Sequence, residues 1–261
     1  MSIDFHSAQN RYTYATREAD PTWRQAISEI IAVAGRDALD IGCGGGIYTK
    51  ALAQMGAAYV IGVDFSRKML QGAQEYCQGY DTITFNVGSA LATGLPDERY
   101  DLVLERALTH HLKPEELPTC FAEARRLLRS GGVLIVQNRT PEDCSLPGDT
   151  THVRGYYFER YPRLLAREAA RRPDSATIFA ALQQAGFHTI EERKLWETVK
   201  VYPDISALSN ELLARTGRSI LHELNDEELR ALVDYVRERF VGYNQQIVEQ
   251  GRWTLWAARK D

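Results

Sequence analysis

Short apolar runs alternate with amphipathic runs along most of the chain. The apolar runs have the length and residue types of buried strands, and the amphipathic runs have the 3.6-residue period of helices. We expect strands over residues 38–41, 59–63, 82–87, 100–104, 133–137, 186–190 and 252–258. We expect helices to begin near Asp20, Tyr48 and Ser66, and to cover residues 114–128, 176–185, 205–216 and 226–243. Strands that alternate with helices in this way predict a doubly wound, mostly parallel α/β sheet.

Two stretches are longer than such a sheet needs, residues 139–175 and 201–250. We expect both to leave from the carboxyl-end half of the sheet, where α/β proteins bind their ligands, and to form a helical cap over the site. The predicted sheet domain is then made of residues 20–138, 176–200 and 251–261. Residues 1–19 precede it and are rich in aromatic and basic side chains.

A glycine-rich turn follows the first predicted strand. The pattern is Asp40-x-Gly42-x-Gly44-x-Gly46, and the next strand ends in Asp64. Strand, glycine turn and helix N-terminus together let a ligand lie on backbone amides, and an acid on the neighbouring strand can bind a ribose. A dinucleotide fingerprint would need a third glycine at position 47, which is Ile47.

The acid two residues before the first glycine gives this motif a close resemblance to class I S-adenosylmethionine (SAM) methyltransferases, of the small-molecule type with a ubiquinone–menaquinone methyltransferase-like core. The resemblance is close from about Asp20 to Gln137 and covers the last strands by topology only. It implies a Rossmann-like sheet whose seventh strand is antiparallel beside the sixth, SAM as cofactor, and in-line methyl transfer to a small-molecule acceptor. The cofactor residues that it implies are Tyr14, Arg17, Asp40, Gly42, Cys43, Gly44, Gly46, Asp64, Phe65, Met69, Ser89, Ala90, Leu91, Glu105 and Arg106.

Ser89 and Glu105 depart from the family pattern. Ser89 stands where many relatives carry an aspartate for the adenine amine, so the backbone of Ala90 and Leu91 is expected to help. Glu105 stands where a small or neutral residue is usual; it is expected to bond the cofactor's amino group or lie near the sulfonium, and the alternative is an ion pair with Arg106.

His110 and Tyr14 are the candidate catalytic residues. His110 lies after the fourth strand, at the edge where open α/β sheets place their chemistry, and is a candidate general base. The alternative is that it packs or caps the next helix. In related methyltransferases the N-terminal segment folds over the cofactor as a lid, which makes Tyr14 and Arg17 candidates to meet the methionine carboxylate or the substrate. The alternative for that segment is a frayed tail.

The first insertion holds seven arginines and no lysine. The planar guanidinium suits carboxylate and phosphate, so an anionic or aromatic acceptor is one interpretation. Arg139, Arg154, Arg215 and Arg218 flank turns and are the candidate acceptor-binding residues. The rival interpretation is that these arginines tie the cap to itself through Glu142, Asp143 and Glu223.

The net charge of −4 and the pI near 5.9 argue against general attraction to nucleic acid. No apolar run is long enough to span a bilayer, so no membrane partner is expected. Four scattered cysteines indicate free thiols of a cytoplasmic protein, and the histidines show no metal-ligand spacing, so no metal is expected.

Three other functions remain open: a nucleic-acid methyltransferase on the same core, a nicotinamide oxidoreductase, and a regulator that binds SAM without turnover. The sequence does not identify the methyl acceptor, the atom methylated, the need for a general base, the residues that line the acceptor pocket or the oligomeric state.

Overall fold

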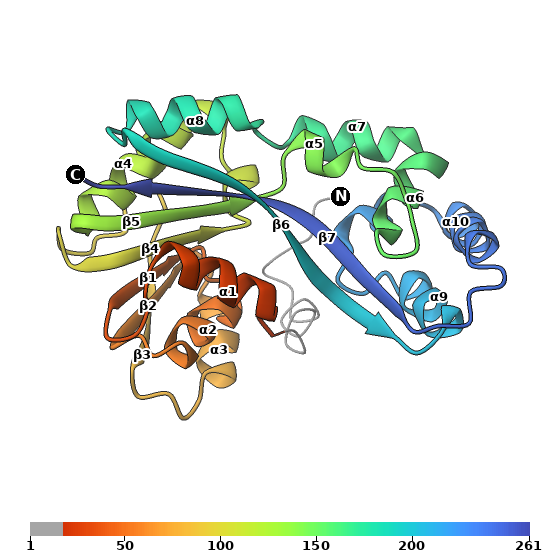
Figure 1. Ribbon diagram of the computed structural model, residues 1–261, viewed down its shortest axis with the longest axis horizontal. Coiled ribbons are helices and arrows are strands. Elements are labelled where there is room, and N and C mark those ends of the chain that lie inside the picture. Colours follow the sequence, from red (N-terminus) through yellow and green to blue (C-terminus); the bar gives the residue numbers. More distant parts are fainter. Residues whose placement is uncertain (1–17) are drawn as a thin grey trace. The chain divides into compact units, whose positions relative to one another are not determined.

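The structure is a computed structural model that describes residues 18–261 (Figure 1). Tyr14, Arg17 and nearly all of the expected lid lie outside these residues. The described chain divides into two compact units. The sheet unit comprises residues 18–138, 173–195 and 254–261, and the second unit comprises residues 139–172 and 196–253. The expected cap role of residues 139–175 and 201–250 stays a prediction.

Seven strands form one sheet in the order β3-β2-β1-β4-β5-β7-β6. Strands β1 to β5 pair in parallel, and β7 pairs antiparallel with β5, for example Val136 with Trp256. The predicted doubly wound sheet with an antiparallel last strand beside the sixth is therefore confirmed. The strands are β1 (Asp37–Ile41), β2 (Tyr59–Asp64), β3 (Ile83–Val87), β4 (Tyr100–Arg106), β5 (Leu128–Asn138), β6 (Thr189–Tyr202) and β7 (Ile247–Arg259).

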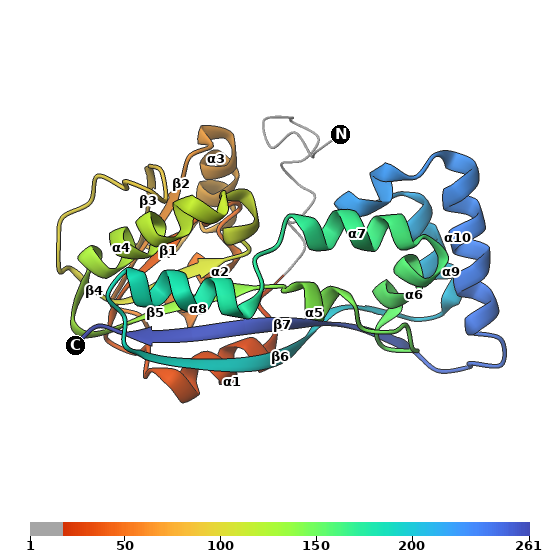
Figure 2. The same ribbon diagram turned by 90° about the horizontal axis from the view of Figure 1, so that it is seen from above.

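Helices cover both faces of this sheet (Figure 2). Helices α4 and α8 pack on one face through residues such as Phe121 and Leu182, and α1 and α2 pack on the other through Trp23 and Leu52. The alternating strand pattern sends Val136 to the first face and Ile135 to the second. The helices of this unit are α1 (Pro21–Ile30), α2 (Ile47–Gln54), α3 (Arg67–Tyr76), α4 (Leu117–Leu127) and α8 (Ser175–Gln184).

Side-chain caps set where several helices begin. Asp20 accepts from the Thr22 amide at 2.8 Å at the start of α1, and Ser66 accepts from the Met69 amide at 3.4 Å at the start of α3. The expected helix over residues 114–128 is instead a 3-10 turn (Pro114–Glu116) followed by α4. Strands β5 and β6 are longer than expected: β5 begins before Gly131, which has a positive φ inside the strand, and β6 continues to Tyr202.

The second unit has its own apolar core. Tyr157, Tyr202, Leu208 and Leu232 are among its fully or almost fully buried side chains. The last part of β6 and the first part of β7 belong to this unit. Its helices are α5 (Pro141–Cys144), α6 (Val153–Arg160), α7 (Pro162–Ala170), α9 (Ile205–Leu213) and α10 (Asp226–Arg239), with a 3-10 turn at Ser219–Glu223.

Within the described chain, no helix combines the length and the apolar character needed to cross a bilayer. All four cysteines are buried and none forms a disulfide. The same residues contain no group of histidine, cysteine and carboxylate side chains that could hold a metal ion.

Candidate cofactor site

The glycine turn lies at the carboxyl end of β1, between β1 and α2. Gly42, Gly44 and Gly46 all have positive φ, at 74°, 52° and 81°. A Cβ on Gly46 would lie 3.0 Å from Ala73 and 3.1 Å from the Cys77 sulfur, so packing against α3 requires that glycine. Among residues 18–261, a Cβ on Gly44 would meet only the Met69 methyl, at 3.5 Å, so these residues leave the space beside Gly44 almost open. Gly44 is therefore where a ligand can approach the backbone.

Asp64 closes the turn from the end of β2. One carboxylate oxygen accepts from the Gly44 amide at 3.0 Å, and the other accepts from the Ser66 amide at 2.8 Å. Burial raises the pKa of Asp64, and the two amides partly oppose this. Each oxygen keeps a second lone pair, which is the requirement for binding ribose hydroxyls. Asp64 thus holds the turn and can bind a nucleoside at the same time.

Asp40 is almost fully buried behind the turn. The Thr49 hydroxyl donates to its carboxylate at 2.6 Å, which ties β1 to α2. Burial raises the pKa of Asp40 to about 6, and the charge of Asp64 adds to this rise while Arg106 opposes it. Cys43, three residues after Asp40, is buried beside Gly62.

Arg106, at the end of β4, lies against the first turn of α2. Its guanidinium carbon is 4.0 Å from the centre of the Tyr48 ring, and Tyr48 packs edge-on against Trp23. The Trp23 indole donates to Gln137 at 2.9 Å, so α1, α2, β4 and β5 meet in this cluster. The cation–π contact holds Arg106 beside the glycine turn.

The turn after β3 carries the residues expected to face adenine. The Ser89 hydroxyl accepts from the Leu91 amide at 3.2 Å, so it is engaged in holding its own turn. Ala90 lies between these residues at the tip of the turn. Phe65, after β2, is an apolar ring that is 64% exposed.

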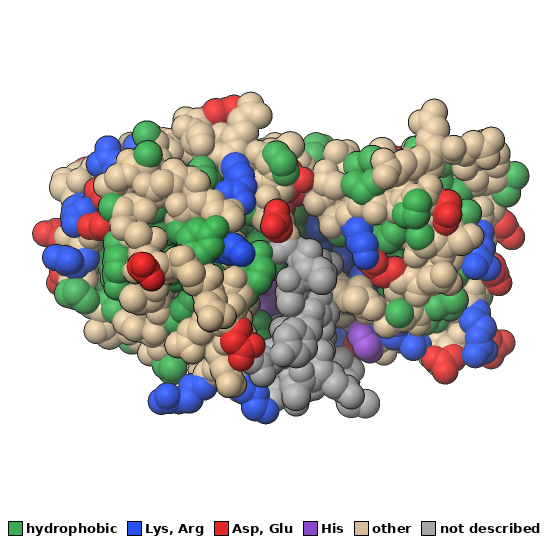
Figure 3. Space-filling model, turned by 90° about the horizontal axis from the view of Figure 1, so that it is seen from below, with side chains coloured by type: hydrophobic (Ala, Val, Ile, Leu, Met, Phe, Trp, Pro, Cys, Tyr) green, Lys and Arg blue, Asp and Glu red, His purple; other side chains and the backbone are tan. Residues whose placement is uncertain are grey.

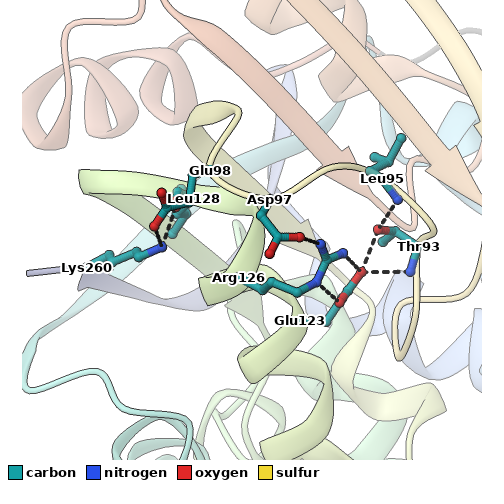
Figure 4. A network of polar contacts seen from close by, with 8 residues as sticks. All are labelled: Thr93, Leu95, Asp97, Glu98, Glu123, Arg126, Leu128 and Lys260. Atoms are coloured by element: carbon teal, nitrogen blue, oxygen red, sulfur yellow. Dashed lines mark hydrogen bonds and ion pairs between the residues drawn. The ribbon is translucent and has the colours of Figure 1, made fainter.

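The loop that follows this turn is fixed to α4 (Figure 4). Glu123 accepts from the Thr93 amide at 2.8 Å and from the Thr93 hydroxyl at 2.6 Å. Arg126 donates two hydrogen bonds to Glu123 and also pairs with Asp97. Burial raises the pKa of Glu123, but the bonds from Arg126 and Thr93 outweigh it and lower that pKa. Nothing in the sequence alone indicates the contact with Thr93, although Glu123 and Arg126 have the i, i+3 spacing of a helical ion pair.

Glu105 is completely buried on β4. The Cys120 sulfur of α4 lies 3.5 Å from both carboxylate oxygens, and burial raises the pKa of Glu105 to about 7. The carboxyl side chain thus lies in the apolar layer under α4. The cofactor role of Glu105 stays a prediction, and a backbone contact from this strand end fits its position better than a carboxylate contact.

The chain turns sharply after β4. Ala107 has φ of 54°, and its amide donates to the Gln137 carbonyl at 2.8 Å. The turn brings Leu108 onto Gly42, whose Cβ would lie 3.0 Å from the leucine methyl. His110 follows in a 3-10 turn (Thr109–His111), with its ring centre 4.0 Å from that of His111. Strain of this kind is common beside functional sites, and His110 as a general base stays a prediction.

The four arginines expected to bind the acceptor all lie in the second unit. The Arg139 guanidinium lies 4.3 Å from the Trp253 ring, and Arg154 pairs with Glu168. Arg215 donates to two backbone carbonyls and pairs with Asp226, and Arg218 is buried against Glu249. The contacts of Arg215 and Arg218 favour a structural role, although the partners are not the acids that the sequence suggested. Glu142 and Asp143 pair with Arg252, and Glu223 pairs with Arg167.

The sheet unit combines a glycine turn that is open at Gly44, a strand-end carboxylate and an exposed aromatic ring, all at the carboxyl ends of its strands. This arrangement on a sheet with an antiparallel seventh strand defines a class I methyltransferase fold.

Comparison with known proteins shows similarity to methyltransferases. Residues 39–136 match a family model described as "Methyltransferase domain". The chain is 34% identical to a demethylmenaquinone methyltransferase of Tropheryma whipplei over 58% of this chain and 62% of the relative. It is 36% identical to a ubiquinone biosynthesis O-methyltransferase of Methylococcus capsulatus over 44% of this chain and 48% of the relative. The matches thus span less than two thirds of these relatives.

Solved structures share the fold well beyond this segment. A putative methyltransferase from an antibiotic biosynthesis pathway of Anabaena variabilis superposes with a TM-score of 0.69 at 22% identity, and the match covers 92% of this chain and 98% of that one. Together these findings confirm the fold predicted from the sequence, that of a class I methyltransferase.

Proposed function

We propose that this chain transfers a methyl group from SAM to a small-molecule acceptor. The observation that carries the proposal is the Gly44–Asp64 arrangement, in which a backbone amide and a carboxylate meet at two neighbouring strand ends and the described residues leave the space beside Gly44 almost open. The family match of residues 39–136 supports the same cofactor. Gly44 and Asp64 would hold the ribose, Phe65 and the turn at Ser89–Leu91 the base, and the end of β4 the methionine part.

The sulfonium of SAM supplies an already activated methyl group. The protein therefore has mainly to hold the acceptor in line with it, and orientation of this kind can lower a barrier by several kcal/mol, up to about 7–11 kcal/mol in well-oriented systems. Two contacts would keep the site rigid for this purpose. Glu123 and Arg126 fix the loop that contains Thr93, next to the turn proposed to hold the adenine, and the Tyr48 ring fixes Arg106. A base such as His110 would be needed only if the acceptor atom must lose a proton.

The second unit is proposed as the acceptor-binding part, because the core fold does not need it and it carries many cationic and aromatic side chains. Two relatives are named for methylation in menaquinone and ubiquinone synthesis, so quinol precursors are the first acceptors to test. The acidic net charge supports a small molecule over nucleic acid. On the face drawn in Figure 3, Lys and Arg side chains lie among Asp and Glu and do not gather in one patch.

A turnover assay tests the proposal. The protein is incubated with SAM and a panel of quinol precursors, aromatic carboxylates and phosphate monoesters, and S-adenosylhomocysteine is measured by mass spectrometry. Product that depends on both protein and acceptor supports methyl transfer. Tight cofactor binding with no product across the panel would favour a regulator that binds SAM without turnover.

A further inference from the structure

Residues 88–99, all of which the structure describes, cross from β3 to β4 without a helix. The crossovers from β1 to β2, from β2 to β3 and from β4 to β5 each contain one. A loop without a helix has no continuous apolar stripe to hold it against the sheet. Leu91 and Leu95 pack partly buried against the core that includes Phe121 of α4. The position of the loop therefore depends on these two side chains and on its polar contacts.

The first part of this loop, residues 88–93, is a closed turn. The Ser89 carbonyl accepts from the Ala92 amide at 3.1 Å. A Cβ on Gly88 would lie 3.0 Å from the Thr93 carbonyl, so the chain folds back until Thr93 lies against Gly88. A contact that fixes Thr93 therefore fixes the end of the turn and, with it, the shape of the whole turn.

Thr93 is held by a side chain of α4. Its amide donates to Glu123 at 2.8 Å and its hydroxyl donates to the same carboxylate at 2.6 Å (Figure 4). The Thr93 hydroxyl also accepts from the Leu95 amide at 3.2 Å. Thr93 is 6% exposed and the Glu123 side chain is 9% exposed. Because a buried donor that loses its partner is costly, these bonds hold the loop firmly to the helix.

Arg126 keeps Glu123 ionised. It donates to both carboxylate oxygens of Glu123, at 2.8 and 2.7 Å, and also pairs with Asp97. Burial raises the pKa of Glu123, but the bonds from Arg126 and Thr93 outweigh it and lower that pKa to about 2. Glu123 is therefore a carboxylate at neutral pH, and hydrogen bonds to a charged acceptor are stronger than bonds to a neutral one.

The turn can offer a base only its backbone and one hydroxyl as polar groups. Residues 88–92 carry no charged side chain, and the Ser89 hydroxyl already accepts from the Leu91 amide at 3.2 Å. A long side chain can rotate toward a ligand, whereas a backbone group points only where the fold of its turn directs it. Recognition of a base by this turn therefore requires that the turn keep one shape before the ligand arrives.

We propose that Glu123 is a positioning residue for the cofactor, which acts through Thr93 to hold the turn at residues 88–93 in the shape that recognises adenine. This inference rests on the proposed function, because it takes that turn as the one that receives the base of SAM. Glu123 acts through the turn and is not expected to touch the ligand. Without it the turn takes other shapes, which weakens the hydrogen bonds to the base and leaves the ribose contacts at Asp64 in place.

Calorimetry with two ligands tests this role. S-adenosylhomocysteine carries the adenine amine, whereas S-inosylhomocysteine carries a carbonyl oxygen there and an N–H on the neighbouring ring nitrogen, which reverses the hydrogen-bond pattern. We expect the parent to bind the adenine ligand more tightly, since a site built to bond a group rejects an analogue that lacks it. Glu123→Ala should bind the adenine ligand roughly tenfold or more weakly, with little change for the inosine ligand. A general loss of stability would not alter this selectivity.

Two variants of Thr93 keep the test decisive if Glu123→Ala does not fold. Thr93→Val removes the hydroxyl bond to Glu123 and should lose part of the selectivity, whereas Thr93→Ser keeps a hydroxyl and should retain it. In the ligand-free protein, the amides of Leu91 and Ala92 should exchange faster in Thr93→Val than in Thr93→Ser, because these amides close the turn.

Glu98→Ala is the matched control. Glu98 lies at the far end of the same loop, has a side chain that is 66% exposed and pairs with Lys260 at 3.1 Å (Figure 4). Its loss removes the same charge without touching Thr93, so the selectivity should stay that of the parent. Parent selectivity in both Glu123→Ala and Thr93→Val, or an equal fall in Glu98→Ala, would overturn this inference alone. A parent protein that binds neither ligand would overturn the proposed function and this inference with it, so the two failures are distinguishable.

Discussion

Asp64 has two tasks in the site. It accepts from the amides of Gly44 and Ser66, and the same carboxylate is proposed to bind the ribose. A simple loss of cofactor affinity on mutation would therefore not separate a direct contact from a loosened turn. The distinction needs a ligand that lacks the hydroxyls.

We expect Asp64→Ala to weaken S-adenosylhomocysteine binding by about 2 kcal/mol or more, since hydrogen bonds to charged groups contribute ~1.5–3 kcal/mol. Binding of a 2′,3′-dideoxyribose analogue should be weakened much less by Asp64→Ala, because this ligand has no ribose hydroxyls to bond to Asp64. Calorimetry with both ligands on parent and variant checks this. Equal losses for the two ligands would mean that Asp64 only holds the turn.

Gly44 and Gly46 are expected to differ. Gly44→Ala places a methyl group in nearly open space among the described residues. It should therefore lower the free energy of unfolding only by the ~1–2 kcal/mol that a left-handed alanine costs, while it strongly weakens cofactor binding. Gly46→Ala meets Ala73 and Cys77 and should lower the melting temperature more. Melting curves and cofactor calorimetry on the two variants test this difference. A Gly44→Ala protein that binds the cofactor with normal affinity would show that no ligand approaches the backbone at Gly44.

Glu105 predicts a pH dependence of stability. Its pKa is raised to about 7 in the folded protein from 4.5, so between these pH values the folded state holds a proton that the unfolded chain releases. The stabilisation is complete below pH 4.5 and is lost as the pH rises through 7. At about 1.4 kcal/mol per pKa unit, the loss is on the order of 3 kcal/mol.

The glutamine of Glu105→Gln cannot ionise, so the variant should lack this part of the pH dependence of stability. In urea unfolding at pH 5.5 and pH 8, the free energy of unfolding of the variant relative to that of the parent should be greater at the higher pH. Other groups such as Asp40 titrate in both proteins, so their contribution cancels in the comparison. Identical pH slopes would mean that Glu105 is not the buried acid described above.

At the scale of elements, the strand–glycine turn–helix unit could be predicted because its signals are local: apolar alternation, glycines, and caps such as Asp20 and Ser66. Contacts between segments that are distant in the sequence could not be predicted. The burial of Glu105 depends on Cys120, fifteen residues later on α4, and the role of Arg218 depends on Glu249 on β7. Nothing in the spacing of Arg154 and Glu168 shows that they share one cluster.

Arg218, between α9 and the following 3-10 turn, links several elements of the second unit. Its side chain is 5% exposed and makes two hydrogen bonds to Glu249 and one to the Tyr202 hydroxyl, at 2.6–3.0 Å. The Tyr202 hydroxyl in turn donates to Glu211 at 2.7 Å, so β6, β7 and α9 meet at one guanidinium.

We expect Arg218→Met to destabilise this unit by about 3–5 kcal/mol, because it leaves the buried Glu249 unpaired. Hydrogen exchange should show faster opening of β6, β7 and α9 residues within the unit. Arg163→Gln is the control, since the Arg163–Glu228 pair is exposed and worth no more than about 1 kcal/mol. Unchanged exchange in Arg218→Met would return Arg218 to the candidates for acceptor binding.

At the scale of the whole molecule, the chain divides into two compact units. The sheet unit contains the segment that matches the methyltransferase family model and the proposed cofactor site, and the second unit is proposed to bind the acceptor. The two insertions led us to expect a sheet domain and a cap, and the role of the cap stays a prediction. The identity of the acceptor depends on long-range contacts that no motif encodes.

The central claim is that the Gly44–Asp64 site binds SAM. Calorimetric titration of S-adenosylhomocysteine into the parent protein tests it most directly, with NADH titrated as the competing nucleotide. The account predicts one site per chain with micromolar-range affinity for S-adenosylhomocysteine and no saturable binding of NADH. Absence of S-adenosylhomocysteine binding by a protein that melts cooperatively, or tighter binding of NADH, would contradict it.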